Sequence, residues 1–83
     1  MTLEQYIQEH DGMINNKKRL IQVAKHSNRI VAIVPCGLDV MELKVSRKEF
    51  IESCINELEE EPSNQFDFGQ PIYNWNTRTL YIN

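Results

Sequence analysis

The segment from Ile30 to Val34 constrains the fold more than any other, because every residue in it is apolar and four of the five are β-branched. Such a run predicts a strand that is buried on both faces, in the middle of a sheet. We expect Pro35 to end this strand, because proline has no N–H group to donate to a neighbouring strand. The run is also far shorter than the roughly 20 apolar residues that cross a bilayer.

The residues after this strand predict a hairpin followed by a helix. Cys36 and Gly37 form the expected turn, and residues 40–45 then alternate between the two faces of a half-exposed strand. The short connection favours antiparallel pairing of the two strands. Ser46, followed three residues later by Glu49, has the spacing of a capping box, so we expect a helix to begin there.

The first 26 residues predict helical structure with one interruption. Thr2 begins a possible capping box, after which apolar residues recur at steps of three and four. The dipeptide Asp11-Gly12 is typical of a turn, so we expect a break between residues 11 and 16. Acidic residues come early in this segment and basic residues late, as the helix dipole favours. A second interpretation stays open for residues 20–25, which could instead form a strand.

The remaining strands are expected near the end of the sequence. Residues 72–75 and 79–82 are rich in aromatic and β-branched residues, with a turn between them, and predict a second hairpin. The resulting order is α-α-β-β-α-β-β. We therefore predict an α+β fold, a small single domain over residues 1–83, in which helices pack on one face of a roughly four-stranded antiparallel sheet.

The composition limits the classes of function. A chain of 83 residues, 41% hydrophobic and 25% charged, has room for one ordinary globular domain. Two cysteines make no disulfide framework, and the first residues show no secretory signal, so we expect a reduced, cytoplasmic protein. The histidines and cysteines lack the spacing of a metal site, and no phosphate-binding loop or catalytic motif is present. We expect no cofactor, no metal and no enzymatic activity.

The formal net charge of −3 is the balance of two oppositely charged segments. Residues 17–29 hold five basic residues and no acidic one, whereas residues 49–61 hold six glutamates and no base. Glutamates at the C-terminal end of a helix are disfavoured by its dipole and by one another, which suggests that they have a use. We expect an acidic surface that faces a partner, formed by Glu52, Glu57, Glu59, Glu60 and Glu61.

These features favour a small acidic protein-binding module that acts by contact and not by catalysis. An inhibitor, adaptor or regulatory accessory protein fits, of the kind with which phages and prokaryotes cover the basic surface of a nucleic-acid enzyme. We expect an apolar contact or dimer face at Tyr73, Trp75 and Tyr81. The uncharged strand at residues 79–82 is expected to be an edge through which two copies pair as a homodimer.

Two alternatives stay open. The first is a nucleic-acid-binding protein, although the net acidity argues against it. Its phosphate contacts would be Lys17, Lys18, Arg19, Lys25 and Arg29. The second is a cysteine-dependent enzyme, in which Cys36 is the nucleophile and His26 or His10 is the base, if the fold brings them together.

Overall fold

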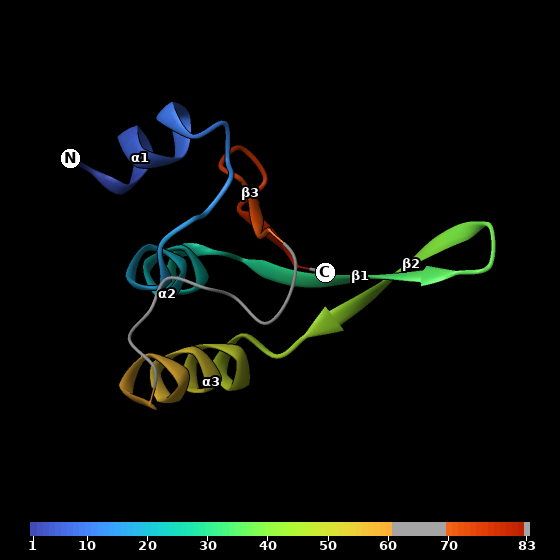
Figure 1. Ribbon diagram of the computed structural model, residues 1–83. Helices are drawn as coiled ribbons and strands as arrows, with labels where there is room; N and C mark the ends of the chain where they lie inside the picture. The colour runs from blue at the N-terminus through green and yellow to red at the C-terminus, as the bar shows by residue number, and fades with distance from the viewer. Residues whose placement is uncertain (61–69, 83) are drawn as a thin grey trace.

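The computed structural model describes residues 1–60 and 70–82, and Figure 1 shows their arrangement. The described residues form three helices and a four-stranded sheet. The elements are α1 (Leu3–Glu9), α2 (Lys17–His26), β1 (Arg29–Cys36), β2 (Asp39–Val45), α3 (Arg47–Glu60), β3 (Ile72–Asn74) and β4 (Thr79–Ile82). The α+β class and the order of elements are as predicted. No helix in the described part of the chain is long and apolar enough to cross a membrane.

The N-terminal helical segment is divided into α1 and α2, as Asp11-Gly12 predicts. Asp11 and Gly12 both have positive φ angles, of 52° and 82°. The Thr2 side chain accepts a hydrogen bond from the backbone of Gln5, whose side chain accepts one from the Thr2 N–H, so the capping box is complete. Residues 20–25 lie within α2, where their apolar side chains face the core, so the alternative of a strand there is wrong.

The sheet has the strand order β2-β1-β4-β3 and is mixed, which corrects the prediction of a purely antiparallel sheet. β1 pairs antiparallel with β2, and β3 with β4, so both predicted hairpins are confirmed. The predicted end of the first strand at Pro35 is wrong, because β1 continues to Cys36, which pairs with Asp39. β1 and β4 run parallel, with Ile30 opposite Leu80. The chain returns to the far side of β1 only after α3, and the apolar pattern of β4 does not specify the direction in which it enters the sheet.

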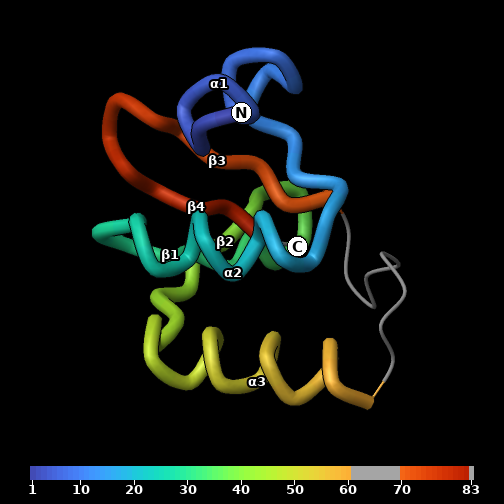
Figure 2. The backbone as a smooth tube through the Cα atoms, turned by 90° about the vertical axis from the view of Figure 1, so that its left-hand side faces the viewer, coloured from blue at the N-terminus to red at the C-terminus, as the bar shows by residue number. Residues whose placement is uncertain are grey.

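One row of side chains crosses the sheet and supports the helices. Val45 of β2, Ile30 of β1, Leu80 of β4 and Tyr73 of β3 lie opposite one another in the strand register. The last three are buried and share one core with residues of α2 and α3, among them Leu20, Val23, Phe50 and Cys54. Figure 2 shows α2 in front of the strands and α3 beside it. This row defines the helix-facing side of the sheet.

Strand β4 lies inside the sheet, which corrects the prediction that residues 79–82 form an edge. Leu80 is fully buried and Thr79 nearly so. The absence of charge in this strand therefore reflects its burial between β1 and β3, and does not mark an edge for a second copy.

The two edge strands are β2 and β3, and residues 12–14 cover one of them. The Tyr73 N–H of β3 donates to the Gly12 carbonyl at 2.8 Å, and the Ile14 N–H donates to the Pro71 carbonyl at 3.0 Å. An isolated bridge lies between these two hydrogen bonds. Within residues 1–60 and 70–82, β2 is the edge whose outer side has no paired segment.

Gly12 and Gly37 provide a matched test of the contact between residues 12–14 and β3. Both glycines have positive φ, but a Cβ at Gly12 would lie 2.6 Å from the Tyr73 carbonyl oxygen, whereas one at Gly37 would meet nothing within 4 Å. We expect Gly37→Ala to lower the free energy of unfolding by about 1–2 kcal/mol. Gly12→Ala should lower it by at least about 1 kcal/mol more, because backbone must move. Denaturant unfolding measures both, and equal losses would contradict the close contact.

Candidate functional site

The outer half of the β1–β2 hairpin extends beyond the rest of the sheet, and we call residues 33–43 the arm. β4 pairs with β1 only from Arg29 to Ala32, whereas β2 pairs with β1 as far as Cys36. A tight turn closes the arm, and Gly37 supplies the positive φ that such a turn requires. Figure 1 shows the arm standing clear of the three helices.

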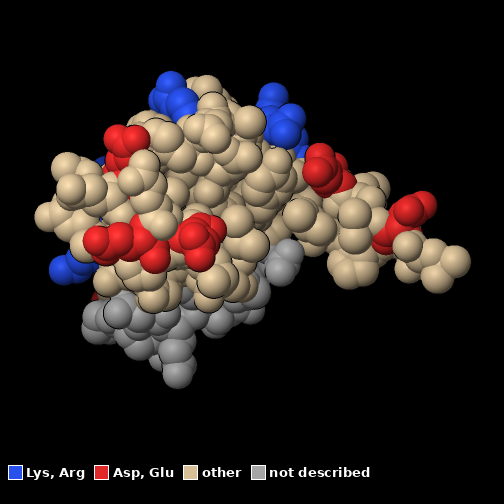
Figure 3. Space-filling model, turned by 90° about the horizontal axis from the view of Figure 1, so that it is seen from above, with Lys and Arg blue, Asp and Glu red and all other residues tan. Residues whose placement is uncertain are grey.

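The arm exposes large apolar side chains on both of its faces. Leu38 at the tip is 108% exposed and Val40 is 67% exposed, while Met41 and Leu43 are each 45% exposed. Exposed apolar residues are ordinary when they are scattered, but several on one projecting element are typical of a protein contact. In Figure 3 the arm is the projection on the right, and most of its visible surface is neither basic nor acidic, although some acidic side chains lie on it.

The predicted half-burial of residues 40–45 is wrong, because Val45 is the one residue among them that is not exposed. The physical reason is that β4 and the helices end before they reach the arm, so neither face of the arm is covered. One feature of the sequence indicates that the arm is exposed to solvent and not to the core. Leu38 is a large apolar residue beside Gly37 in a tight turn, where a polar residue is usual.

The acidic face of α3 consists of Glu52, Glu59 and Glu60, which are all exposed. No salt bridge joins these three to a basic residue in the described part of the chain. The last turn of α3 contains no base, so Glu59 and Glu60 lie at the negative end of the helix dipole. Glu61, predicted for the same surface, lies outside the described residues.

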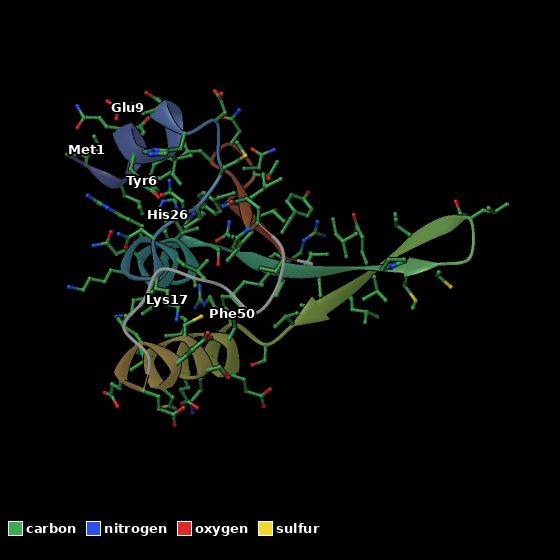
Figure 4. The ribbon with its side chains drawn as sticks, viewed as in Figure 1. Met1, Tyr6, Glu9, Lys17, His26 and Phe50 are labelled. Atoms are coloured by element: carbon green, nitrogen blue, oxygen red, sulfur yellow. The ribbon has the colours of Figure 1, made fainter. Side chains whose placement is uncertain are left out.

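Glu57 pairs with Lys17, although the two were predicted to face a protein partner and a nucleic acid, respectively. The Glu57 carboxylate lies 3.4 Å from Lys17 Nζ, and the Lys17 side chain is 5% exposed. Lys17 begins α2 and Glu57 lies in the last turn of α3, so each charge occupies the end of its helix that the dipole disfavours. Figure 4 places Lys17 between the two helices. The ion pair offsets both unfavourable positions.

The five basic residues of segment 17–29 do not form one exposed patch. Because α2 begins at Lys17, the first three of these residues lie at the N-terminal end of a helix. The prediction had placed them towards the C-terminal end of a longer helical segment, and it is wrong in this respect. Lys17 is buried, and Arg19 lies over the ring of Tyr6, 5.2 Å from its centroid. The other three are exposed, namely Lys18, Lys25 and Arg29.

The three aromatic residues predicted as a contact face do not share one surface. Tyr73 is 2% exposed and belongs to the core. Trp75 is half-buried and stacks on His26, with ring centroids 4.3 Å apart. Tyr81 lies opposite Ile72 and thus on the other side of the sheet from Tyr73. Tyr73 and Trp75 thus pack with the core, and the predicted contact face does not form.

Cys36 is exposed and lies opposite Asp39 at the outer end of the arm, which stands clear of the helices (Figure 1). His26 ends α2 and stacks on Trp75, and His10 follows α1 and stacks on Tyr6. The pair of nucleophile and base that the enzyme alternative requires is therefore not brought together. Among the described residues, no three side chains able to ligate a metal gather at one point.

His26 connects α2 to the second hairpin. Its Nδ1 lies 2.5 Å from the Tyr73 hydroxyl, and its carbonyl accepts two hydrogen bonds from the Arg78 guanidinium, at 3.0 and 2.8 Å. Burial lowers the pKa of His26, and the positive charge of Arg78 lowers it further. The folded protein therefore favours neutral His26.

This environment predicts a loss of stability on mild acidification. The unfolded chain binds the proton more readily than the folded protein, so the stabilisation is present above the unfolded pKa near 6.5 and is lost as the pH falls through the lower folded pKa. We expect the free energy of unfolding to fall between pH 7.5 and 5.5. His26→Gln should weaken this dependence, and His10→Gln should keep it. An unchanged profile in His26→Gln would contradict the assignment.

The two cysteines should differ sharply in reactivity. Cys36 is exposed, whereas Cys54 is 7% exposed, and burial together with Glu57 raises its pKa to about 11. At pH 8 only about one in a thousand Cys54 thiols is ionised at that pKa. We expect iodoacetamide to modify one cysteine in the native protein and both in denaturant, as measured by mass spectrometry. Native modification of both at similar rates would contradict the position of Cys54 in the core.

Comparison of the chain with models of protein families, with curated proteins and with solved structures finds no match.

Proposed function

We propose that this protein is a small, non-catalytic binding module that acts by contact with other proteins, as an inhibitor, adaptor or regulatory accessory protein. The observation that supports it best is the arm, which presents Leu38, Val40, Met41 and Leu43 to solvent on a projecting hairpin. A small domain gains stability by burying apolar residues, so apolar side chains left on an element outside the core point to a contact with another chain.

The charge of the exposed helix indicates the chemistry of a second partner. Glu59 and Glu60 remain at the disfavoured end of α3, whose last turn contains no base, and Glu52 adds a third exposed carboxylate on the same helix. A protein with a basic surface complements this face, and its approach would be accelerated at low salt. We place this contact in the cytoplasm, where both cysteines stay reduced.

The test measures binding and stability in the same variants. Replacing Glu59 and Glu60 by lysine should raise the free energy of unfolding by about 0.3–1 kcal/mol per residue at low salt, because the helix dipole then favours both charges. The same double variant should lose a partner that the unaltered protein retains from an extract of the host. The matched control reverses Glu4 and Glu9 of α1, which are also exposed, and should keep that partner.

The arm is tested in parallel with Leu38→Ser/Val40→Ser, which removes exposed apolar side chains and leaves the core intact. We expect this variant to lose contacts with other chains while its thermal unfolding is unchanged. Partners retained through the acidic face of α3 must be proteins, so nuclease treatment should not release them, and they should dissociate as salt is raised because that contact is ionic. The proposal is wrong if the arm and α3 variants bind the same set of molecules as the unaltered protein, or if only nucleic acid is retained through Lys18 and Lys25.

A further inference from the structure

Among the described residues, the outer side of β2 is the sheet edge whose backbone N–H and C=O groups have no neighbouring strand. β4 is internal, and residues 12–14 cover β3, which leaves the outer side of β2 unpaired among the described residues. Unpaired N–H and C=O groups along an edge are a template for another strand. The occupant must satisfy these groups and also match the side chains of Asp39–Val45.

A second copy can add its own β2 only under strict geometric rules. Two identical antiparallel edges are related by a two-fold axis perpendicular to the sheet, so both copies present their helices on the same side. Residues directly opposite each other then point to the same face of the sheet. For this reason a single residue of β2 must lie on the axis, opposite its own copy.

One register matches the side chains of β2. With Leu43 on the axis, Glu42 lies opposite Lys44 of the second copy, and Lys44 lies opposite Glu42. Met41 lies opposite Val45 on the helix-facing side, next to the Leu43 pair. The ladder thus contains two pairs of opposite charge on one face and a continuous apolar row on the other.

The neighbouring registers place like charges together. With Glu42 on the axis, two glutamates face each other directly, and with Lys44 on the axis, two lysines do. Like charges directly opposite one another destabilise a sheet. With Met41 on the axis, Glu42 lies opposite Val40 and no charge is paired. Of the four registers centred on residues 41–44, only the one with Leu43 on the axis places opposite charges together.

We propose that two copies of this protein pair through β2 in this register and form a continuous eight-stranded sheet. The dimer satisfies the open edge and buries Met41 and Leu43, which are each 45% exposed in the single chain. This inference rests on the part of the proposed function that assigns the arm to protein contact. It makes no use of the acidic face of α3.

Charge reversal and its rescue test the register. Glu42→Lys places a lysine opposite Lys44 twice in each dimer, and Lys44→Glu places glutamates opposite each other. We expect each single variant to weaken dimerisation at least about tenfold by sedimentation equilibrium. The double variant Glu42→Lys/Lys44→Glu restores opposite pairs and should dimerise like the unaltered protein. Both residues are exposed, so all variants should keep the same circular dichroism spectrum.

Cross-linking gives a second measurement that does not depend on charge. In a Cys36→Ser background, Leu43→Cys lies opposite its own copy and should form a disulfide-linked dimer under mild oxidation. Val40→Cys is the control, because it is more exposed but lies opposite Ser46 of the second copy. Equal rates of cross-linking for the two variants would overturn the register.

The result also separates this inference from the proposed function. A protein that is monomeric throughout the micromolar range, or single charge variants that dimerise like the unaltered chain, would overturn the dimer. If such a monomer still loses its partners in Leu38→Ser/Val40→Ser, the proposed function stands and the arm binds a different chain. If the dimer forms but no variant changes the set of bound proteins, the proposed function fails and the dimer stands.

Discussion

The parallel pairing of β1 with β4, with Ile30 opposite Leu80, is the interaction on which the rest of the structure depends. It places the buried row of side chains at the centre of the sheet, where α2 and α3 cover it. It also ends at Ala32, because β4 is only four residues long. The remainder of β1 can pair with β2 alone, so the hairpin leaves the body and becomes the arm. The core and the exposed apolar residues of the arm thus have the same cause.

A second constraint comes from the ends of the helices. The interruption at Asp11-Gly12 makes Lys17 the first residue of α2, at the positive end of its dipole. Glu57 lies at the negative end of the α3 dipole, which disfavours its negative charge. The ion pair between Lys17 and Glu57 holds the two helix ends together. Glu59 and Glu60 lie one turn or less further on and have no such partner in the described chain. Glu57 therefore stabilises the contact between α2 and α3, whereas the charges of Glu59 and Glu60 are not used in that contact.

Local signals predicted most of the elements, whereas the contacts between distant elements were not predictable. The capping box at Thr2, the turn at Asp11-Gly12 and the two hairpins depend on neighbouring residues and were correct. The edge position expected of residues 79–82 was wrong. An uncharged sequence is expected both for a strand buried inside a sheet and for an edge strand that pairs with another chain, so the sequence does not distinguish the two. The burial of Tyr73 depends on which strand lies beside it, and no local pattern contains that information.

The charges of β2 have two effects that follow from the same electrostatics. Glu42 and Lys44 oppose the indiscriminate addition of strands to the open edge, since most registers leave a charge unpaired or beside a like charge. In the one register that pairs them, the two-fold axis places both α3 helices on the same side of the sheet. The proposed dimer would therefore carry two acidic faces on one side. If a single partner has two basic surfaces, binding of the first face would raise the effective concentration at the second.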